Sequence, residues 1–274
     1  MDRRRLILEE MGITPIWRLQ ERAPATTDAD ASDPAPVQSD APVSAQDTRA
    51  SRDPRQREPL AAPAGAADSP QGPTDDRRMR ILRMDWDPLK AAVAQCTACP
   101  LHEKRTNTVF GVGDEQADWM FVGEGPGAEE DAKGEPFVGQ AGRLLDSMLP
   151  AIGLRRGAGV YIANCVKCRP PGNRNPEPAE ALACEPYLQR QIELIRPKLI
   201  VALGKVAAAN LLATDASVAS MRGKVHKYRG TPLIVTYHPA YLLRNLPDKA
   251  KAWEDLCFAV RIMQGLQGGA AAPT

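Results

Sequence analysis

Four short runs of apolar residues follow one another between residues 119 and 236, and turn residues or charges bound each of them. The runs are too short for helices, so we interpret them as buried strands. Stretches with apolar residues at helical spacing separate the runs, and we predict helices there. The predicted strands are Trp119–Val122, Val160–Ala163, Leu199–Leu203 and Leu233–Thr236. The predicted helices are Ala141–Ile152, Pro178–Ile195, Lys205–Leu212 and Asp248–Met263.

Strands that alternate with helices in this rhythm form right-handed βαβ units, whose sheet is parallel and covered on both faces. We therefore predict an α/β fold with three layers, α/β/α, around a central four-stranded parallel sheet. Ligands of such folds bind beyond the carboxyl ends of the strands. The residues that directly follow each strand are therefore the first candidates for chemistry.

The chain before this region has a different composition. Residues 24–80 contain mainly Ala, Pro, Asp, Ser, Gln and Arg, and no aromatic residue occurs between Trp17 and Trp86. Such a segment buries too little apolar surface to offset its ordering entropy, so we predict a disordered linker. Acidic residues outnumber basic ones in the linker, whereas residues 86–266 are mildly basic.

We expect three further parts around the linker. Residues 1–23 form a short amphipathic segment, which is either a helix that folds back on the core or a docking peptide for a partner protein. Residues 81–266 form the folded domain, and residues 267–274 form a flexible tail.

Length, charge and targeting signals narrow the class of protein. The chain has 274 residues and a net charge of +1, and no apolar run is long enough to span a bilayer. The first residues are basic, but Glu9 and Glu10 follow after three apolar residues, so a signal peptide is not predicted. We expect a cytoplasmic protein, in which six cysteines indicate a metal site or reactive thiols rather than disulfides.

The cysteines are spaced like metal ligands. Cys96 and Cys99 form a C-x2-C pair, and two more cysteines follow the second predicted strand. Four converging thiolates would hold zinc or an iron–sulfur cluster, and spacing does not distinguish the two. Spacing also leaves open whether Cys165 or Cys168 is a ligand, with Cys184 as the fourth. Cys257 lies among apolar residues of the last predicted helix, which favours a packing role.

Glycines and a histidine follow other predicted strands. The first strand runs into Val122–Asp131, where glycines permit close approach of the backbone to a ligand. A nucleotide-binding loop is the alternative, but its four carboxylates would repel a pyrophosphate. The loop Gly134–Gly142 carries Phe137, which either binds a ligand or fills the core of its own loop.

The fourth predicted strand runs into His238, and a histidine at a strand end is a catalytic candidate. Leu242 and Leu243 follow it, and we expect both on an exposed loop. The basic run Arg222–Arg229 indicates a solvated hairpin, or a phosphate contact if it lies near a pocket.

Five motifs in this order resemble the family-4 uracil-DNA glycosylases, the iron–sulfur branch of that superfamily. They are C-T-A-C, G-E-G-P-G-A-E-E-D, G-E-P-F-V-G-Q-A-G, N-C-V-K-C-R-P-P-G-N-R and H-P-A-Y-L-L-R, and the resemblance covers about residues 86–265. Each motif is weak alone, but five in order at strand ends are specific. The resemblance implies a uracil-DNA glycosylase-like fold and a 4Fe-4S cluster with a structural role. The cluster ligands that it implies are Cys96, Cys99, Cys168 and Cys184, which leaves Cys165 for packing.

The resemblance also implies the activity. Such an enzyme flips uracil out of DNA and hydrolyses its N-glycosidic bond, which leaves an abasic site. Phe137 would stack on the uracil, Asn164 would read its amide edge, and His238 would stabilise the departing anion. Leu242 would fill the gap in the base stack. The backbone at Gly123, Gly125 and Gly127 would bind the uracil, and Arg169, Arg174 and Arg244 would contact DNA.

The residue that activates water is less clearly implied. In the best-known branch of the superfamily a carboxylate does this, and Gly125 matches its position. We expect Glu124 to take this role, with Glu130 and Asp131 as the other candidates.

Three other functions fit parts of the sequence. They are a protein that binds uracil in DNA without turnover, a redox or zinc protein, and a domain that serves a DNA polymerase. Relatives that bind uracil without turnover carry a basic insertion with a histidine, and this sequence lacks it. The iron content of the protein tests the redox or zinc function. We expect a monomer that binds uracil-containing DNA and does not associate with a membrane. We also expect a repair or replication protein as the partner of residues 1–23.

Overall fold

The computed structural model describes residues 73–268. The predictions for residues 1–23, for most of the linker and for residues 269–274 lie outside this part of the chain. No helix among the described residues is both long and apolar enough to cross a membrane.

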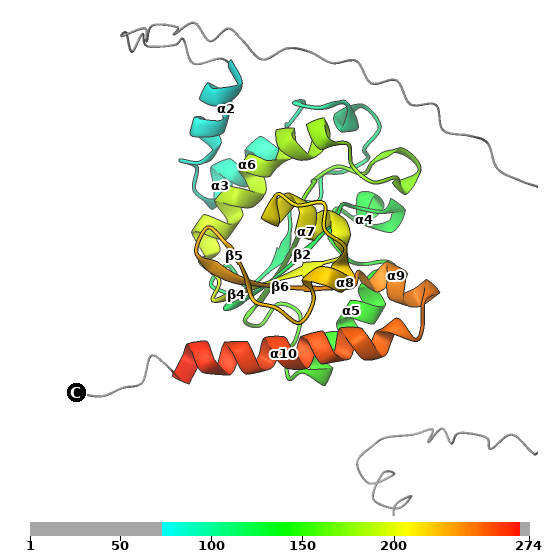
Figure 1. The fold of residues 1–274 in the computed structure, drawn as a ribbon. Helices are drawn as coiled ribbons and strands as arrows, with labels where there is room; N and C mark the ends of the chain where they lie inside the picture. The colour runs from blue at the N-terminus through cyan, green and yellow to red at the C-terminus, as the bar shows by residue number, and fades with distance from the viewer. Residues whose placement is uncertain (1–72, 269–274) are drawn as a thin grey trace, which may run out of the picture. The chain divides into compact units, whose positions relative to one another are not determined.

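A six-stranded sheet forms the centre of the domain, with strand order β1-β3-β2-β4-β6-β5 (Figure 1). The four inner strands are parallel, as predicted, and the short edge strands β1 and β5 are antiparallel to their neighbours. The edge strands were not predicted because runs of two and three residues carry no usable period. The strands are β1 (Val112–Gly113), β2 (Trp119–Gly123), β3 (Val160–Asn164), β4 (Leu199–Leu203), β5 (His226–Tyr228) and β6 (Thr231–Thr236).

The four predicted helices are present, and the last one extends further than its apolar pattern. Short helices also occur in loops that the sequence left irregular. The α-helices are α2 (Pro73–Ile81), α3 (Trp86–Ala94), α4 (Ala128–Lys133), α5 (Gln140–Ala151), α6 (Pro178–Ile195), α7 (Lys205–Leu212), α8 (Val218–Met221), α9 (Pro239–Arg244) and α10 (Asp248–Gly268). The 3₁₀ helices are η1 (Pro100–Glu103) and η2 (Pro171–Asn173).

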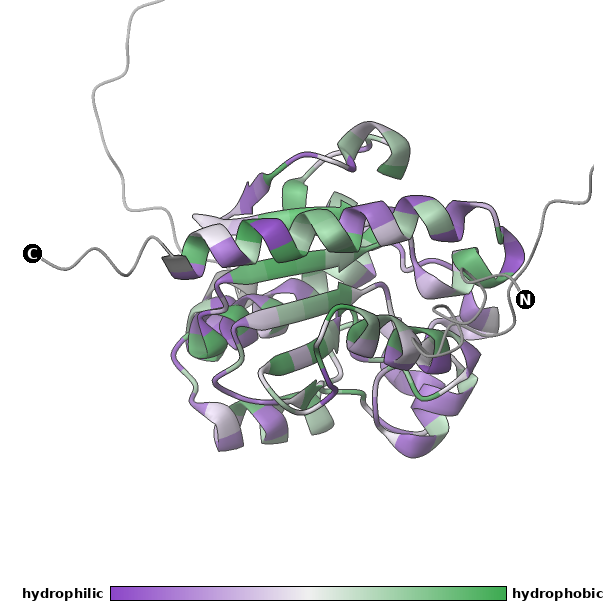
Figure 2. Cartoon of the chain, turned by 90° about the horizontal axis from the view of Figure 1, so that it is seen from below, coloured by the Kyte–Doolittle hydropathy of each residue, from purple (hydrophilic) through white to green (hydrophobic). Residues whose placement is uncertain are grey.

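Alternate residues of the inner strands face opposite sides of the sheet, and each side has its own apolar core. On one side Met120 and Val122 pack with residues of α6 and α7. On the other side Trp119 and Phe121 pack with residues of α5 and α10. Figure 2 shows α10 lying across this second face, with hydrophobic strands beneath it. The predicted three layers are therefore confirmed.

A third apolar cluster joins α2, α3 and η1 to the outer side of α6. Helix α2 begins at Pro73, so the end of the segment 24–80 is helical. Ile81 is 2% exposed, and Arg78 forms an ion pair with Glu185 of α6 at 2.5 Å. This helix therefore adds contacts that the predicted domain start at residue 81 leaves out.

The sheet register brings the strand ends together. Gly123 at the end of β2 pairs with Asn164 at the end of β3. Leu203 of β4 pairs with Thr236 of β6, and His238 follows two residues later. The glycine loop, Asn164 and His238 therefore share one edge of the sheet, where ligands of such folds bind.

Candidate active site

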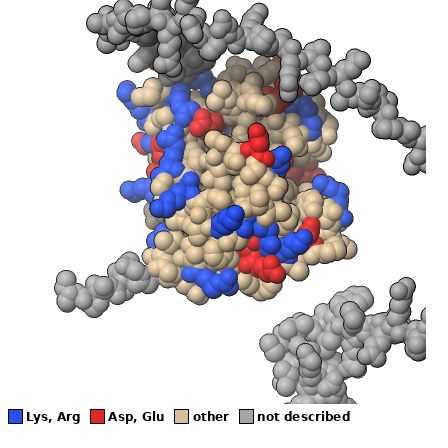
Figure 3. All heavy atoms as spheres, viewed as in Figure 1, with Lys and Arg blue, Asp and Glu red and all other residues tan. Residues whose placement is uncertain are grey.

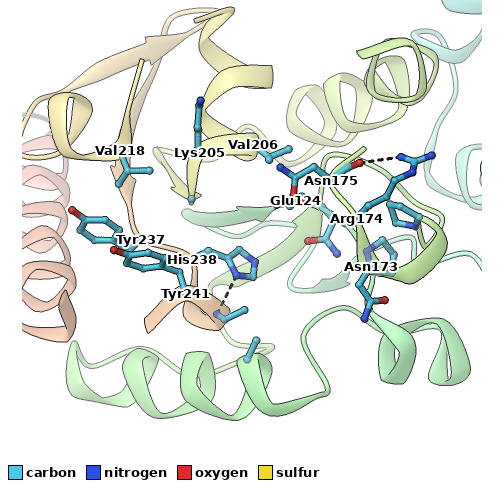
Figure 4. Close-up of a pocket in the computed structure, with 18 of the residues that line it drawn as sticks. Glu124, Asn173, Arg174, Asn175, Lys205, Val206, Val218, Tyr237, His238 and Tyr241 are labelled. Carbon is cyan, nitrogen blue, oxygen red and sulfur yellow. Dashed lines mark hydrogen bonds between the residues drawn. The ribbon is translucent and has the colours of Figure 1, made fainter. Parts of the chain in front are cut away.

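A cavity of about 690 Å³ opens at this edge of the sheet (Figure 4). It brings together most of the predicted site residues from segments far apart in the sequence. Those that line it are Glu124, Gly125, Gly127, Glu130, Phe137, Asn164, Arg174, His238 and Arg244. The predicted residues Gly123, Asp131, Arg169 and Leu242 are not among its lining residues.

Asn164 presents an unpaired acceptor to this cavity. Its side chain is 2% exposed, and its Oδ1 has no hydrogen-bond partner among the described residues. An unpaired buried acceptor costs about 1–3 kcal/mol, so the site is built for a ligand that donates a hydrogen bond. A Cβ atom on Gly123 would lie 2.4 Å from this oxygen and 2.5 Å from the Phe137 ring. Only glycine at that position leaves the cavity open between the two side chains.

A buried lysine holds the backbone of Asn164. Lys167 is 1% exposed, and its Nζ donates to the Asn164 carbonyl at 2.9 Å and to Gln191 Oε1 at 2.6 Å. Burial lowers the pKa of Lys167 to about 8. Sequence reasoning missed this residue, because nothing in the motif N-C-V-K-C shows that its lysine points inward.

Phe137 is held in a strained backbone conformation. Its φ is +55°, a left-handed value that few non-glycine residues adopt, and its ring is 5% exposed. Arg156 donates to the carbonyl of Phe137 at 2.7 Å and pairs with Asp146 at 2.8 Å. The ring centroid of Phe137 lies 5.5 Å from that of His238. The left-handed backbone of Phe137 and the hydrogen bond from Arg156 thus position this aromatic ring next to His238.

Two of the three predicted water-activating carboxylates have structural partners. Glu130 accepts hydrogen bonds from the backbone N–H groups of Gly127 (3.1 Å), Val138 (3.0 Å) and Gly139 (2.9 Å). Asp131, buried behind the loop, accepts two bonds from the Thr106 N–H at 2.9 and 3.0 Å. These carboxylates hold loops in place.

Glu124 remains the candidate for activating water. It lines the cavity, and no described residue hydrogen-bonds or ion-pairs with its carboxylate. Burial raises its pKa above the ordinary value of 4.5. A carboxylate with a raised pKa is a better proton acceptor, so its position and basicity suit a general base.

The side chain of His238 is uncharged. It is the N-cap of α9, and its Nδ1 accepts the N–H of Ala240 at 3.1 Å. Burial lowers its pKa to about 4, and the charge of Arg244 acts in the same direction, against Glu130. Because Nδ1 is an acceptor, the single ring proton is on Nε2. The ring can therefore donate one hydrogen bond without carrying a charge.

The expectation that Leu242 lies on an exposed loop is wrong. The segment after His238 folds into helix α9, and Leu242 on its inner side is 1% exposed. In the segment after His238 the exposed leucines are Leu243 at 39% and Leu246 at 60%. Consecutive residues of a helix point to different sides, so Leu242 is buried while Leu243 is exposed. The expectation of a loop did not include this difference.

The predicted DNA-contacting arginines differ in their partners. Arg174 donates to both carboxylate oxygens of Glu180, at 2.8 and 2.7 Å, and so anchors the loop after β3 to α6. Arg169 donates to Asn173 Oδ1 at 2.7 Å. Arg244 is exposed at the cavity. Figure 3 shows basic and acidic side chains interspersed over the face viewed there.

Four cysteines meet in a second, small cavity beside α6. They are Cys96, Cys99, Cys168 and Cys184. All six cysteines of the chain are free thiols in the structure. N–H donors face three of the four sulfurs. Arg105 reaches Cys168 Sγ at 3.1 Å, Arg77 reaches Cys96 Sγ at 3.6 Å, and the backbone N–H of Lys167 reaches Cys184 Sγ at 3.3 Å.

The structure separates Cys165 from this group. Cys165 is 3% exposed and packs in the core between the sheet, α6 and α7. Burial raises its pKa to about 12, as expected for an inert thiol. Cys168, three residues later, is the one that joins the other cysteines.

The chemistry of the four-cysteine cavity fits a metal centre held by thiolates, because four cysteines line it and N–H donors face three of the sulfurs. No group of three or more His, Cys, Asp or Glu residues in the described chain is arranged to hold one metal ion. Hydrogen bonds to the sulfurs are also typical of such sites.

Comparison with known proteins agrees with this geometry. The chain belongs to the uracil DNA glycosylase superfamily, whose family model matches residues 110–257. The resemblance to this superfamily is therefore confirmed.

Three relatives are type-4 uracil-DNA glycosylases. That of Thermotoga maritima is 51% identical over 161 residues, which cover 58% of this chain and 83% of that protein. That of Archaeoglobus fulgidus is 48% identical over 165 residues, covering 57% and 82%. That of Sulfurisphaera tokodaii is 47% identical over 176 residues, covering 61% and 79%.

Proposed function

We propose that this protein is a type-4 uracil-DNA glycosylase, which hydrolyses the bond between uracil and deoxyribose in DNA and leaves an abasic site. One observation carries the proposal. The buried, unpaired Oδ1 of Asn164 lies in a cavity with Phe137 and a neutral His238. The similarity to type-4 enzymes supports the same activity.

Asn164 distinguishes uracil from cytosine in this proposal. Uracil presents an N–H donor at N3 and a carbonyl acceptor at O4. The Oδ1 of Asn164 accepts from N3, and its Nδ2 donates to O4. Cytosine presents an acceptor and an amino group at these places, so both contacts would be lost. Phe137 stacks on the flipped base, which leaves the duplex to enter the cavity.

His238 stabilises the leaving group. When the bond between C1′ and N1 breaks, its electron pair stays on the uracil, which becomes an anion with charge at N1 and O2. The Nε2–H of His238 donates to O2 as this charge develops. A neutral donor suits this role, because its hydrogen bond strengthens in the transition state. The backbone N–H groups between Gly123 and Gly127 contribute in the same way.

Water completes the reaction. Its oxygen bonds to C1′, and Glu124 accepts the proton that the water releases. Glu130 acts by holding the glycine loop and the Phe137 loop together through its three backbone bonds.

We assign a 4Fe-4S cluster to Cys96, Cys99, Cys168 and Cys184. The cluster is structural, because hydrolysis of an N-glycosidic bond needs no electron transfer. Its ligands lie on the C-x2-C segment, the loop after β3 and helix α6. Cys168 is four residues from Asn164, so the cluster stabilises the segment that carries the base-reading side chain.

DNA contacts lie around the cavity. Arg244, which is exposed at the cavity, contacts a phosphate in this proposal, whereas the pairing of Arg174 with Glu180 gives that arginine a structural role first. Leu243 replaces Leu242 as the residue that fills the gap in the base stack, because only an exposed side chain can enter DNA. A monomeric state and a cytoplasmic location stay predictions, as does a partner for residues 1–23.

A cleavage assay tests the function. The protein is incubated with an oligonucleotide that holds one uracil, and alkali then breaks the strand at any abasic site. We expect breakage at uracil, none in the matched cytosine and thymine oligonucleotides, and a large loss of breakage in Asn164→Asp. A retained protein–DNA band without breakage would instead show a uracil-binding protein without turnover. Absence of both breakage and binding would refute the proposal.

A further inference from the structure

The cavity extends beyond the residues that the excision of uracil requires. One part contains Glu124, Phe137, Asn164 and His238. The other part lies toward α7, α8 and α9 and includes Lys205, Val218, Tyr237, Tyr241 and Arg244. Figure 4 shows Tyr237 and Tyr241 together on one side of His238, and Asn173 and Arg174 on the other. Of this second part, only Arg244 enters the proposed function, as a phosphate contact.

Two tyrosine rings form its wall. The centroids of Tyr237 and Tyr241 are 5.2 Å apart, and their planes are nearly parallel, at 13°. The Arg222 guanidinium lies 6.0 Å from the Tyr237 ring centroid. The hydroxyl of Tyr241 donates to Asp248 Oδ2 at 2.6 Å. These contacts hold the rings in place before any ligand binds, so little ordering would be needed on binding.

The chemistry of this wall matches a nucleobase. An aromatic ring beside a cationic rim binds a base of a single strand, because every base has a π face that can stack on the open side of the ring. Arg244 and Lys205 supply the positive charge for the sugar–phosphate backbone. The wall directly flanks His238, since Tyr237 precedes it and Tyr241 lies in the first turn of α9. A base stacked here is therefore a near neighbour of the flipped uracil along the same strand.

We propose that Tyr237 and Tyr241 form a second base-binding subsite, which takes the nucleobase next to the flipped uracil. The inference rests on the proposed glycosylase function. A neighbouring base is free to move onto this wall only when it is unpaired. The enzyme therefore prefers uracil in single-stranded or locally opened DNA, and the second base contributes to substrate binding.

Oligonucleotides in which a nucleotide next to the uracil lacks its base test the subsite. Three single-stranded oligonucleotides carry one uracil. One has both neighbouring bases, and the others have a tetrahydrofuran residue in place of the 5′ or the 3′ neighbour. For the natural chain we expect the loss of one of these neighbours to lower kcat/KM about tenfold, mainly through KM, as base–aromatic stacking implies. The ratio of kcat/KM for the complete oligonucleotide to kcat/KM for the one that lacks this neighbour is then about ten. In Tyr241→Leu we expect this ratio to fall to about one.

Two further variants distinguish the effect of the Tyr241 ring from the effect of its hydroxyl group and from the loss of an aromatic residue elsewhere on the surface. Tyr241→Phe keeps the ring and loses only the bond to Asp248, so it retains the tenfold ratio. Trp253→Leu is the matched control, because Trp253 is an exposed aromatic residue of α10 that does not line the cavity. It leaves the ratio and the activity unchanged. Equal melting temperatures show that the variants are folded.

The outcomes separate the subsite from the function. Equal excision of all three oligonucleotides by the natural chain would refute the subsite and leave the glycosylase function standing. A ratio that persists in Tyr241→Leu would also refute it. Failure to excise uracil from the complete oligonucleotide would refute the proposed function itself.

Discussion

At the scale of single residues, burial decides the chemical state of the site. His238 is neutral because desolvation lowers its pKa to about 4, and Glu124 is more basic than an exposed glutamate because desolvation raises its pKa. The proposed reaction needs His238 neutral and Glu124 ionised. Both requirements fail as pH falls, and Glu124 is protonated first, because burial raises its pKa whereas burial lowers the pKa of His238.

This order predicts the pH dependence of excision. The acid limb of the single-turnover rate belongs to Glu124 in the natural chain. In Glu124→Gln we expect a rate about a hundredfold lower, as for loss of a general base. Its remaining acid limb moves down toward pH 4, where His238 becomes protonated. The measurement is the single-turnover rate between pH 4 and 8, with circular dichroism at each pH to confirm folding. A limb near pH 6.5 in both proteins would show that His238 titrates at its ordinary value.

At the scale of elements, the loop after β3 shows what a pattern can and cannot predict. The four inner strands, the main helices and the positions of chemistry at strand ends followed from the sequence. The choice between Cys165 and Cys168 did not follow from spacing, because it depends on which side of the loop meets α6. The structure places Cys165 in the core under α6 and α7, and Cys168 with Cys184 of α6.

Serine substitutions at two buried cysteines test this division. We expect Cys184→Ser to lower the iron content per folded protein and the melting temperature together, because it removes a cluster ligand. Cys165→Ser buries a hydroxyl and costs roughly 1–3 kcal/mol, but it keeps the iron. Metal analysis of both purified variants and the natural chain is the measurement. Zinc in place of iron would refute the cluster, and equal iron loss in both variants would refute the ligand set.

At the scale of the whole molecule, helix α2 extends the domain beyond its matched family region, which begins at residue 110. It packs on α6, and Arg77 contacts both the Ala183 carbonyl at 3.0 Å and the sulfur of Cys96. Arg77 also lies 5.1 Å above the ring of Tyr187. Through Arg77 the helix therefore contacts one of the four cysteines of the cavity.

Two deletions test the role of α2. Removal of residues 1–72 leaves excision in a short duplex, iron content and melting temperature unchanged. Removal of residues 1–81 also deletes Ile81 and both arginine contacts, which costs at least about 2 kcal/mol from the apolar burial alone. We expect a lower melting temperature and faster loss of iron during oxidation. If the shorter deletion abolishes excision, residues before Pro73 belong to the catalytic domain.

The sequence by itself determined the order of the four inner strands and the main helices along the chain, and the motifs that follow the strands. These follow from local periodicity and turn chemistry, which neighbouring residues specify. Only the tertiary structure decided that Leu242 is buried, that Glu130 and Asp131 brace loops, and that His238 is neutral. Each of these depends on partners that lie far away in the chain. Burial and hydrogen-bond partners are properties of the packed molecule, so no local pattern contains them.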